Sequence, residues 1–474
     1  MNRRELLRAG AAAAAGTVTA RGRARAATNG QASGLPAFPN DFLFGAATSC
    51  VQIEGAARED GKSESIWDRF AAQPGATEDG STPAVACDSY HRWEQDFALL
   101  KTMGLQSYRF SIAWPRILPD GKGQVNEKGV DHYNRQIDRL LAMRIQPLVT
   151  AYHWDLPQVL EDAGGWPNRD TAARFADYVQ VLARRFGDRV TRWCLMNEMQ
   201  AFAVAGYGWG VHAPGRRDRG LTLRAAHTSN LAQGAACRAL KAERPRVQAG
   251  VAHDMVLFDP ATPADADREA CRRFDAFRNL WYLDPPFTGK YPEAFVDGVP
   301  YEAMGWKPGD EDRMRAPLDF SGMNFYGGRL LVSAGDKAPL LKGLNAHQSS
   351  EDRAYAGAME RACLWMWNRY RRPVVITETG WEAPDVVAAG GKVHDPARIE
   401  YLRDAFAGVR RAMLQGADVR GVHVWSLIDD WEWQGGFKYR IGLAWVDFKN
   451  PVDRIAKDSA EWYAKVARSR RLDA

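Results

Sequence analysis

The sequence predicts a (β/α)8 barrel with long loops at the carboxyl-terminal rim of its strands. Eight short apolar segments with strand character alternate with segments whose apolar residues recur at helical spacing. The alternation runs without a break in composition, and no predicted helix opens with a glycine-rich dinucleotide- or phosphate-binding motif. An unbroken series of β–α pairs favours a closed barrel over an open doubly wound sheet.

The eight predicted strands cover 42–48, 106–112, 146–152, 190–196, 247–252, 320–324, 373–377 and 421–425. The strand at 373–377 contains the run Val374-Val375-Ile376 and shows no polar alternation. Such a run is typical of a strand buried on both faces of a parallel sheet under helices.

Helical spacing is clearest in four segments between these strands. Their apolar residues are Trp93, Phe97, Leu99 and Leu100; Tyr133, Ile137, Leu140 and Leu141; Phe175, Tyr178, Val179 and Leu182; and Leu402, Phe406, Val409 and Met413. Gly104 predicts the end of the first helix. The connections at 201–221, 255–275 and 327–353 are long, and we expect them to be loops that shape the mouth of a pocket.

The composition is that of an ordinary soluble globular protein, with 46% hydrophobic and 26% charged residues. The net charge of +5 arises at the N-terminus, where the first 26 residues hold six arginines and one glutamate. The rest has 57 basic and 57 acidic residues, which implies no nucleic-acid-binding patch. Most of the 17 tryptophans should pack in the core, and some should stack on flat ligands such as sugar rings.

The N-terminus has the pattern of an export signal. Residues 2–8 resemble a twin-arginine motif around Arg3 and Arg4, and 9–15 form an alanine-rich run too short and too weakly apolar for a membrane span. The alternative is a disordered basic N-terminus. The pattern predicts a signal at 1–26, a polar linker at 27–36 and one domain at 37–474. The precursor would use the twin-arginine export machinery, and the mature protein would be periplasmic or secreted.

The six cysteines, at 50, 87, 194, 237, 271 and 363, show neither CxxC nor metal-ligand spacing. Cys194 and Cys363 lie within apolar segments and are expected to be buried thiols. The sequence leaves a disulfide open. We expect no metal ion and no organic cofactor.

Two glutamates follow predicted strands and are the main candidates for chemistry. Glu378 ends the strand at 373–377, and Glu198 follows Asn197 at the end of the strand at 190–196. Alone, each could be a salt-bridge partner. Two carboxyl groups at one rim of a barrel are what glycoside hydrolysis requires, one as a protonated acid and one as an ionised nucleophile.

Seven motifs then occur in the order found in one known family. They are Phe-Leu-Phe-Gly-Ala-Ala-Thr at 42–48 with Gln-Ile-Glu-Gly at 52–55, Tyr-Arg-Phe-Ser-Ile-Ala-Trp-Pro-Arg at 108–116, Tyr-His-Trp-Asp-Leu-Pro at 152–157, Asn197-Glu198, Asn324-Phe325-Tyr326, Thr377-Glu378, and Val-Trp-Ser-Leu at 424–427 with Glu432-Trp433. From about Phe38 to Phe448 the chain resembles glycoside hydrolase family 1, the β-glucosidase family. The resemblance implies a retaining mechanism and β-linked sugars.

The resemblance also implies which residue takes which role. Glu378 would be the nucleophile and Glu198 the acid that later becomes the base, with their carboxyl groups about 5–5.5 Å apart. Arg109 and Tyr326 would hold Glu378 ionised, and Glu198 would keep its proton in a less solvated place near a negative charge. Asn197 resembles the residue that binds the sugar 2-hydroxyl. Asn324 belongs to the same supporting set.

A second group would bind the sugar in the glycone subsite. Gln52, His153 and Glu432 can make directed hydrogen bonds to hydroxyl groups, and Trp425 and Trp433 can supply a stacking surface and an indole donor. His153 and Trp425 could instead be core residues. In the phospho-glycosidase branch of the family, serine usually replaces Glu432, and a lysine and a tyrosine stand where Tyr439 and Ile441 are here. The sequence therefore predicts an unphosphorylated sugar.

Two neighbours of the glutamates depart from the family pattern. Met199 stands where the family usually has proline, and Thr379 where it usually has asparagine.

The predicted function is that of an exported retaining β-glycosidase acting on a small-molecule β-glycoside or oligosaccharide and releasing a terminal β-D-glucose or related sugar. Transglycosylation on the same site is one alternative, suggested by Trp209, Trp281, Trp306 and Trp381 in predicted loops. A non-catalytic periplasmic sugar-binding protein is the other. Glucose and galactose preference stays open, because the same residues contact both sugars.

Overall fold

The computed structural model describes residues 34–473, apart from 294–300, 335–345, 353–354, 356 and 450–452. The predicted signal at 1–26 and most of the predicted linker at 27–36 lie outside these residues. Among the helices of the described residues, none has the length and apolar character needed to cross a membrane.

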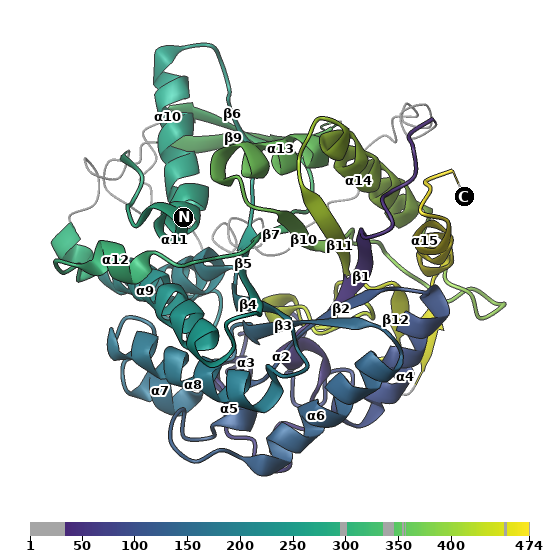
Figure 1. Ribbon diagram of the computed structural model, residues 1–474, viewed down its shortest axis with the longest axis horizontal. Coiled ribbons are helices and arrows are strands. Elements are labelled where there is room, and N and C mark those ends of the chain that lie inside the picture. The colour runs from purple at the N-terminus through teal and green to yellow at the C-terminus, as the bar shows by residue number, and fades with distance from the viewer. Residues whose placement is uncertain are drawn as a thin grey trace.

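Eight strands form a closed parallel barrel, seen as the central ring of Figure 1, in the order β1-β11-β10-β7-β5-β4-β3-β2. They are β1 (Leu43–Ala47), β2 (Ser107–Ser111), β3 (Gln146–Tyr152), β4 (Arg192–Asn197), β5 (Gln248–Asp254), β7 (Ser321–Asn324), β10 (Val374–Thr379) and β11 (Val419–Trp425). The predicted fold class is confirmed. Each predicted strand exists, with ends within two residues of those observed.

Helices surround the ring (Figure 1). The longer ones are α4 (Ser89–Met103), α6 (Glu127–Ala142), α8 (Asp170–Phe186), α9 (Arg219–Glu243), α13 (Ala358–Tyr370), α14 (Pro396–Leu414) and α15 (Asp458–Ser469). All four helices predicted from apolar spacing are present. Gly104 ends α4 as predicted, with a φ of 72° that favours glycine.

Short elements lie in the connections. They are α2 (Cys50–Ile53), α3 (Ile66–Ala71), α5 (Trp114–Ile117), α7 (Gln158–Asp162), η2 (Ala276–Leu280), α11 (Trp281–Thr288), η4 (Tyr301–Met304), α12 (Asp310–Met314), η5 (Trp433–Gly435), β12 (Ala444–Val446) and β13 (Arg454–Ala456).

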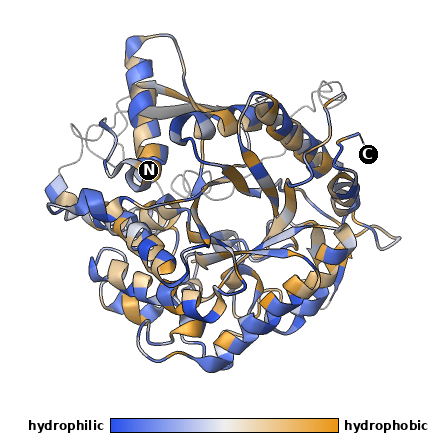
Figure 2. Ribbon diagram, viewed as in Figure 1, coloured by the Kyte–Doolittle hydropathy of each residue, from blue (hydrophilic) through white to orange (hydrophobic). Residues whose placement is uncertain are grey.

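The apolar residues form two layers of core. One lies inside the barrel and includes Leu148, Cys194, Ala252, Phe320 and Val375. The other, much larger, lies between the strands and the helices. Figure 2 shows mainly apolar residues on the strands of the ring and a mixture of apolar and polar residues on the helices around it. A filled barrel leaves the strand ends as the place where polar side chains gather.

The three connections predicted as loops carry structure of their own, which corrects that expectation. The segment after β4 forms the π-helix η1 (Ala201–Trp209), whose first seven residues are all buried. The next forms β6 (Phe258–Pro260) and α10 (Asp265–Asp275), and the third forms β8 (Arg329–Ala334) and β9 (Ala346–Asp352). Strands β6, β8 and β9 make a small separate sheet. Part of the third predicted loop, including 335–345, lies outside the described residues.

The described cysteines, which are all six of the chain, are free thiols. Cys194 and Cys363 are buried as predicted. The sequence left a disulfide open, and this structure contains none between these cysteines.

Candidate active site

The two glutamates singled out by the sequence lie at the same rim of the barrel. Glu198 follows β4 directly, and Glu378 is the last residue but one of β10. Glu198 has a φ of 44°, unusual for a residue with a side chain, and its backbone N–H donates to the carbonyl of Ala252 at 2.8 Å. A strained backbone fixed by a hydrogen bond to the next strand is typical of a functional position.

Glu378 accepts two hydrogen bonds from elements on different sides of the barrel. Arg109 of β2 donates from Nη1 to Oε1 at 2.5 Å, and the Tyr326 hydroxyl donates to Oε2 at 2.7 Å. Both contacts were predicted from the sequence. Arg109 is fully buried, and its Nε donates to the Thr150 hydroxyl at 3.0 Å, which fixes the guanidinium plane.

Glu198 accepts one side-chain hydrogen bond, from Asn324 Nδ2 to Oε1 at 2.7 Å. The same amide donates to Asn197 Oδ1 at 3.0 Å, and the Thr377 hydroxyl donates to Asn324 Oδ1 at 2.6 Å. Arg109 Nη2 also donates to Asn197 Oδ1, at 2.7 Å. Asn197 and Asn324 therefore link the surroundings of one glutamate to those of the other.

The two carboxyl groups differ in charge environment. Burial, together with the negative charges of Asp254 and Glu378, raises the pKa of Glu198 well above its usual range. Burial also raises the pKa of Glu378, but Arg109 and the Tyr326 hydroxyl oppose that rise. The predicted protonated state of Glu198 is thus favoured. At Glu378 the cation only offsets the effect of burial, where the sequence had predicted that it would dominate.

The predicted sugar-binding residues gather at the same rim. His153 stacks on Trp425 with ring centroids 5.5 Å apart, and its Nε2 accepts a hydrogen bond from Asn197 Nδ2 at 3.0 Å. Trp425 Nε1 donates to Glu432 Oε1 at 3.4 Å. Within the described part of the chain, Gln52 Nε2 and His153 Nδ1 are buried without a hydrogen-bond partner. Such atoms are available to sugar hydroxyl groups.

Trp433 lies in an aromatic cluster that includes a residue the sequence analysis did not single out. Trp433 and Trp154 have ring centroids 4.4 Å apart, and Trp433 also lies 4.7 Å from Trp67. Trp154 Nε1 donates to the Asn197 carbonyl at 3.0 Å. Trp154 therefore fixes the backbone of the Asn197-Glu198 pair. Its place in the motif at 152–157 was the available signal.

Asp254 and Arg278 are a second omission. Asp254 is the last residue of β5, and it forms an ion pair with Arg278 of η2. The rule that identified Glu198 and Glu378, a carboxylate at a strand end, would also have found Asp254. That strand was predicted to end at Ala252, two residues before its observed end.

The loop that carries Glu432 is tied to the rest of the protein by buried charges. Asp429 accepts hydrogen bonds from Lys457 at 2.6 Å, from Arg440 at 2.6 Å and from the Gly442 backbone at 3.0 Å. Lys457 also donates to Asp385, at 2.5 Å. These contacts hold the loop between β11 and α15 in one position.

The positions that distinguish the phospho-glycosidase branch are used for other contacts. The Tyr439 hydroxyl donates to the Glu78 carboxylate at 3.2 Å, and Ile441 packs with Trp425 and Ala47. A carboxylate and an apolar side chain do not favour a phosphate group.

The two departures from the family pattern lie in packed surroundings. Met199 is fully buried in the main core. The Thr379 hydroxyl hydrogen bonds to the Tyr401 hydroxyl of α14 at 2.9 Å.

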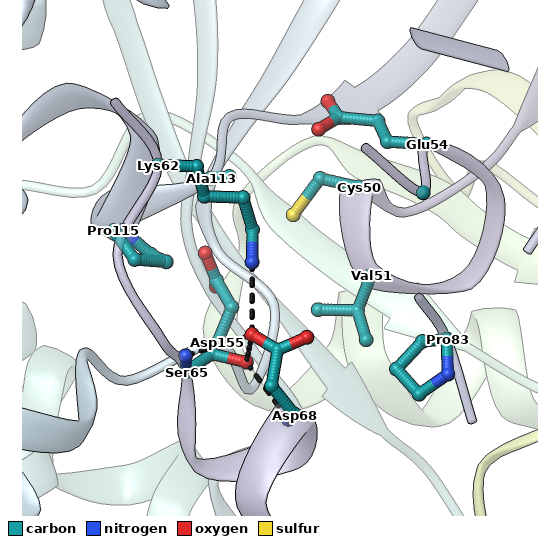
Figure 3. Close-up of a pocket in the computed structure, with 11 residues that line it drawn as sticks. Cys50, Val51, Glu54, Lys62, Ser65, Asp68, Pro83, Ala113, Pro115 and Asp155 are labelled. Carbon is teal, nitrogen blue, oxygen red and sulfur yellow. Dashed lines mark hydrogen bonds and ion pairs between the residues drawn. The ribbon is translucent and has the colours of Figure 1, made fainter. Parts of the chain in front are cut away.

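A small pocket beside α2 and α3 is drawn in Figure 3. Lys62 extends across it and bonds to Asp68 at 2.8 Å, while Cys50 and Glu54 line the other side. Asp155, which also lines it, accepts hydrogen bonds from the Trp114 backbone at 2.7 Å and from the His153 backbone at 3.2 Å. We interpret the residues that line this pocket as structural, because Asp155 among them holds the turn that carries His153.

Comparisons with known proteins agree with this geometry. The model of glycosyl hydrolase family 1 matches residues 35–472. "Beta-glucosidase A" of Thermotoga maritima is 40% identical over 446 residues, covering 92% of this chain and 99% of the relative. A "Bifunctional beta-D-glucosidase/beta-D-fucosidase" of Bifidobacterium breve is 38% identical over 465 residues, covering 90% and 97%. The solved structure of a Thermotoga maritima β-glucosidase in complex with deoxynojirimycin has 37% identity and a TM-score of 0.87, covering 92% of this chain and 99% of that chain.

Proposed function

The chain belongs to glycosyl hydrolase family 1, and we propose that it hydrolyses terminal non-reducing β-D-glycosyl residues, β-D-glucose among them, with retention of configuration. The observation that carries the proposal is the contrast between two carboxyl groups at one rim. Glu198 is placed to keep a proton, and Glu378 receives a guanidinium and a hydroxyl. The small-molecule substrate is a β-glycoside or short oligosaccharide.

In the first step the Glu378 carboxylate attacks the anomeric carbon while the bond to the leaving oxygen breaks. Glu198 transfers its proton to that oxygen, so that the aglycone departs as a neutral alcohol. The product is a glycosyl ester on Glu378. Arg109 and Tyr326 hold the attacking carboxylate in place through hydrogen bonds at 2.5 and 2.7 Å.

In the second step Glu198 acts as a base. The ester on Glu378 is neutral, so one of the negative charges that raise the pKa of Glu198 has gone. Glu198, now ionised, takes a proton from water as the water oxygen attacks the anomeric carbon. The ester bond breaks, the Glu378 carboxylate is restored, and the sugar leaves with its original configuration.

The sugar itself would be bound by Gln52, His153, Asn197 and Glu432, with Trp425 and Trp433 as apolar surfaces. Asn197 is held by Arg109 and Asn324, so its Nδ2 is directed toward His153 and the sugar-binding group. Donors fixed before the sugar arrives cost little reorganisation in the transition state.

The decisive experiment replaces Glu378 with alanine. Turnover of an activated aryl β-glucoside should fall by several orders of magnitude, and added azide should restore it with an α-glycosyl azide as product. Glu269→Ala, at a partly exposed position of α10, is the matched control and should keep full activity. Unchanged turnover in Glu378→Ala would contradict the proposal.

The alternatives are weaker. Of the four tryptophans that suggested transglycosylation, Trp281 is fully buried and Trp381 stacks on Tyr401 with centroids 5.1 Å apart. Family membership and both glutamates speak for an enzyme over a sugar-binding protein without activity. Product analysis with an alcohol acceptor separates hydrolysis from transfer.

We also propose export through the twin-arginine route, supported by Arg3 and Arg4 and by Ala24 and Ala26, the two small residues of a small-x-small cleavage pattern. Replacing both arginines with lysine should keep the protein in the cytoplasm of a bacterial host. N-terminal sequencing of the exported protein should find Ala27 or a residue near it. Export that does not change in the double-lysine variant would contradict this route.

A further inference from the structure

A third carboxylate, Asp254, lies on the strand between those that carry Glu198 and Asn324. Strand β5 pairs with β4 on one side and β7 on the other, and Asp254 is in register with Asn324. The carbonyl of Ala252, two residues earlier, accepts the backbone N–H of Glu198. Asp254 therefore lies close to Asn324, which donates to the Glu198 side chain, and to Ala252, which accepts from the Glu198 backbone.

The direction of the Asp254 side chain follows from strand alternation. Side chains two residues apart on a strand share a face. Ala252 belongs to the core inside the barrel, so Asp254 faces the barrel axis one step nearer the rim. It therefore lies on the side of the sheet where the catalytic groups are.

Asp254 forms an ion pair with Arg278, which belongs to a different element. Arg278 of η2 forms an ion pair with its Oδ2 and also donates to its backbone carbonyl at 3.5 Å. The two side chains are only 15% and 14% exposed, for Arg278 and Asp254 respectively. Limited solvent exposure lets their charges act on neighbours with little screening.

We propose that Asp254 is a positioning residue that keeps the proton on Glu198 in the free enzyme, and that Arg278 limits the strength of this effect. The inference rests on the proposed glycosidase function and adds the residues that regulate its acid. Asp254 touches neither the leaving oxygen nor the nucleophile in this assignment, and acts through Glu198.

The charges around Glu198 support the assignment. Asp254 from β5 and Glu378 from β10 both favour its protonated form, whereas Arg278 from η2 and the amide of Asn324 from β7 favour its ionised form. The Tyr326 hydroxyl also faces this group but donates to Glu378. Arg109, a fully buried cation of β2, is bound to Glu378 and Asn197.

Asp254 has a second effect after the ester forms. Glu378 is then neutral, and Asp254 is the carboxylate that remains beside Glu198. It keeps Glu198 a stronger base toward water than an isolated carboxylate would be. The same charge thus helps the acid in the first step and the base in the second.

The test uses two variants with opposite expected effects. Asp254→Asn should move the basic limb of the pH profile of kcat/KM to lower pH, and Arg278→Gln should move it to higher pH, each by roughly one pH unit. The substrate is an aryl β-glucoside with a poor leaving group, whose departure needs the proton. Asp254→Glu should keep the wild-type profile.

Two controls separate this role from general damage. A dinitrophenyl β-glucoside needs no proton on its leaving group, so its kcat/KM should be nearly unchanged in Asp254→Asn. Asp259→Asn breaks a comparable ion pair with Arg361 in the small outer sheet and should leave the pH profile as it is.

Movement of the basic limb in the same direction in both variants, or no movement in either, would overturn the inference. Arg278→Gln supplies an independent answer if Asp254→Asn does not fold. Absence of turnover in the wild type would instead contradict the proposed function, and trapping of the glycosyl ester with a 2-fluoro sugar distinguishes that case.

Discussion

At the scale of single residues, the roles of the two glutamates depend on which donors reach them. Glu378 accepts from Arg109 and Tyr326, while Glu198 accepts a side-chain hydrogen bond from Asn324, an uncharged amide. Hydrogen bonds from charged or hydroxyl donors stabilise a carboxylate more strongly than amide donors do. Removing a donor to Glu378 should therefore move the acidic limb of the pH profile of kcat/KM, and removing a donor to Glu198 should move the basic limb.

Tyr326→Phe removes a hydroxyl that stabilises the Glu378 carboxylate. The pKa of Glu378 should rise further, because burial is then less opposed, and the acidic limb of kcat/KM should move to higher pH. The loss of a hydrogen bond to a charged group should lower kcat/KM by roughly tenfold to a hundredfold. Tyr401→Phe is the matched control, since its hydroxyl bonds to Thr379, and its acidic limb should stay in place.

Asp430→Asn tests a different buried carboxyl group. Within the described chain, neither Asp430 oxygen has a hydrogen-bond donor, and burial together with Glu432 raises the Asp430 pKa well above its usual range. The folded state then binds a proton that the unfolded state releases, so stability falls as pH rises above the unfolded pKa. The variant should be more stable at neutral pH by about 1 kcal/mol or more, since one unit of pKa shift corresponds to about that free energy, and should show a flatter dependence of Tm on pH.

The neighbouring Asp429 should behave in the opposite way. Its carboxylate accepts from Lys457 and Arg440, so Asp429→Asn removes one carboxylate partner from each cation, and Lys457 is fully buried. The expected loss is roughly 3–5 kcal/mol. Equal effects of the two adjacent substitutions on Tm would contradict this account of both.

At the scale of elements, the end of β10 is set by a close approach between strands. A Cβ atom on Gly380 would lie 2.0 Å from the backbone carbonyl of Trp425 on β11. Only glycine fits against that carbonyl without moving one of the two strands. The close approach therefore fixes how Glu378 is placed relative to Trp425.

Gly380→Ala should lower both the free energy of unfolding and kcat/KM, because β10 or β11 must shift near the nucleophile. We expect a loss of roughly 1–3 kcal/mol in stability from this overpacking. Gly390→Ala is the control, since nothing lies within 4 Å of its Cβ position. Denaturant unfolding and steady-state kinetics of the two variants make the comparison.

The sequence predicted the elements well where an apolar run meets a polar residue or a glycine. It predicted Glu198 and Glu378 at strand ends for that reason. It did not predict that Asp254 belongs to the same rim, because the strand was predicted to end at 252 and β5 continues through the polar His253 to Asp254. It also could not predict Arg278 as the counter-ion, since Arg278 lies 24 residues further along the chain and only the fold brings it close.

At the scale of the whole molecule, buried ion pairs, and no disulfide among the described residues, link distant parts of the chain. Lys457 and Arg398 pair with Asp385, Asp395 and Asp429, all of them buried. The apolar segments did not reveal this cluster, because its members come from distant parts of the chain. Nothing in the local sequence indicates which lysine is buried.

The free thiols lead to a prediction about reducing agents. All six cysteines are unpaired, so a thiol reductant should leave Tm unchanged within error. Lys457→Met, which leaves Asp385 and Asp429 without their shared cation, should instead lower Tm by an amount matching roughly 3–5 kcal/mol. A large fall in Tm with reductant would contradict the free-thiol structure.

The closure of the barrel determines the order in which parts of the protein can fold during synthesis. Strand β1 pairs with β11, so the first strand to leave the ribosome finds one of its two partners only when residue 425 has been made. Lys457, which anchors the loop holding Glu432, comes later still. Until Lys457 has been made, the growing chain has no fixed sugar-binding loop, and until residue 425 has been made it has no closed barrel, so activity should first appear only after Lys457 has been added.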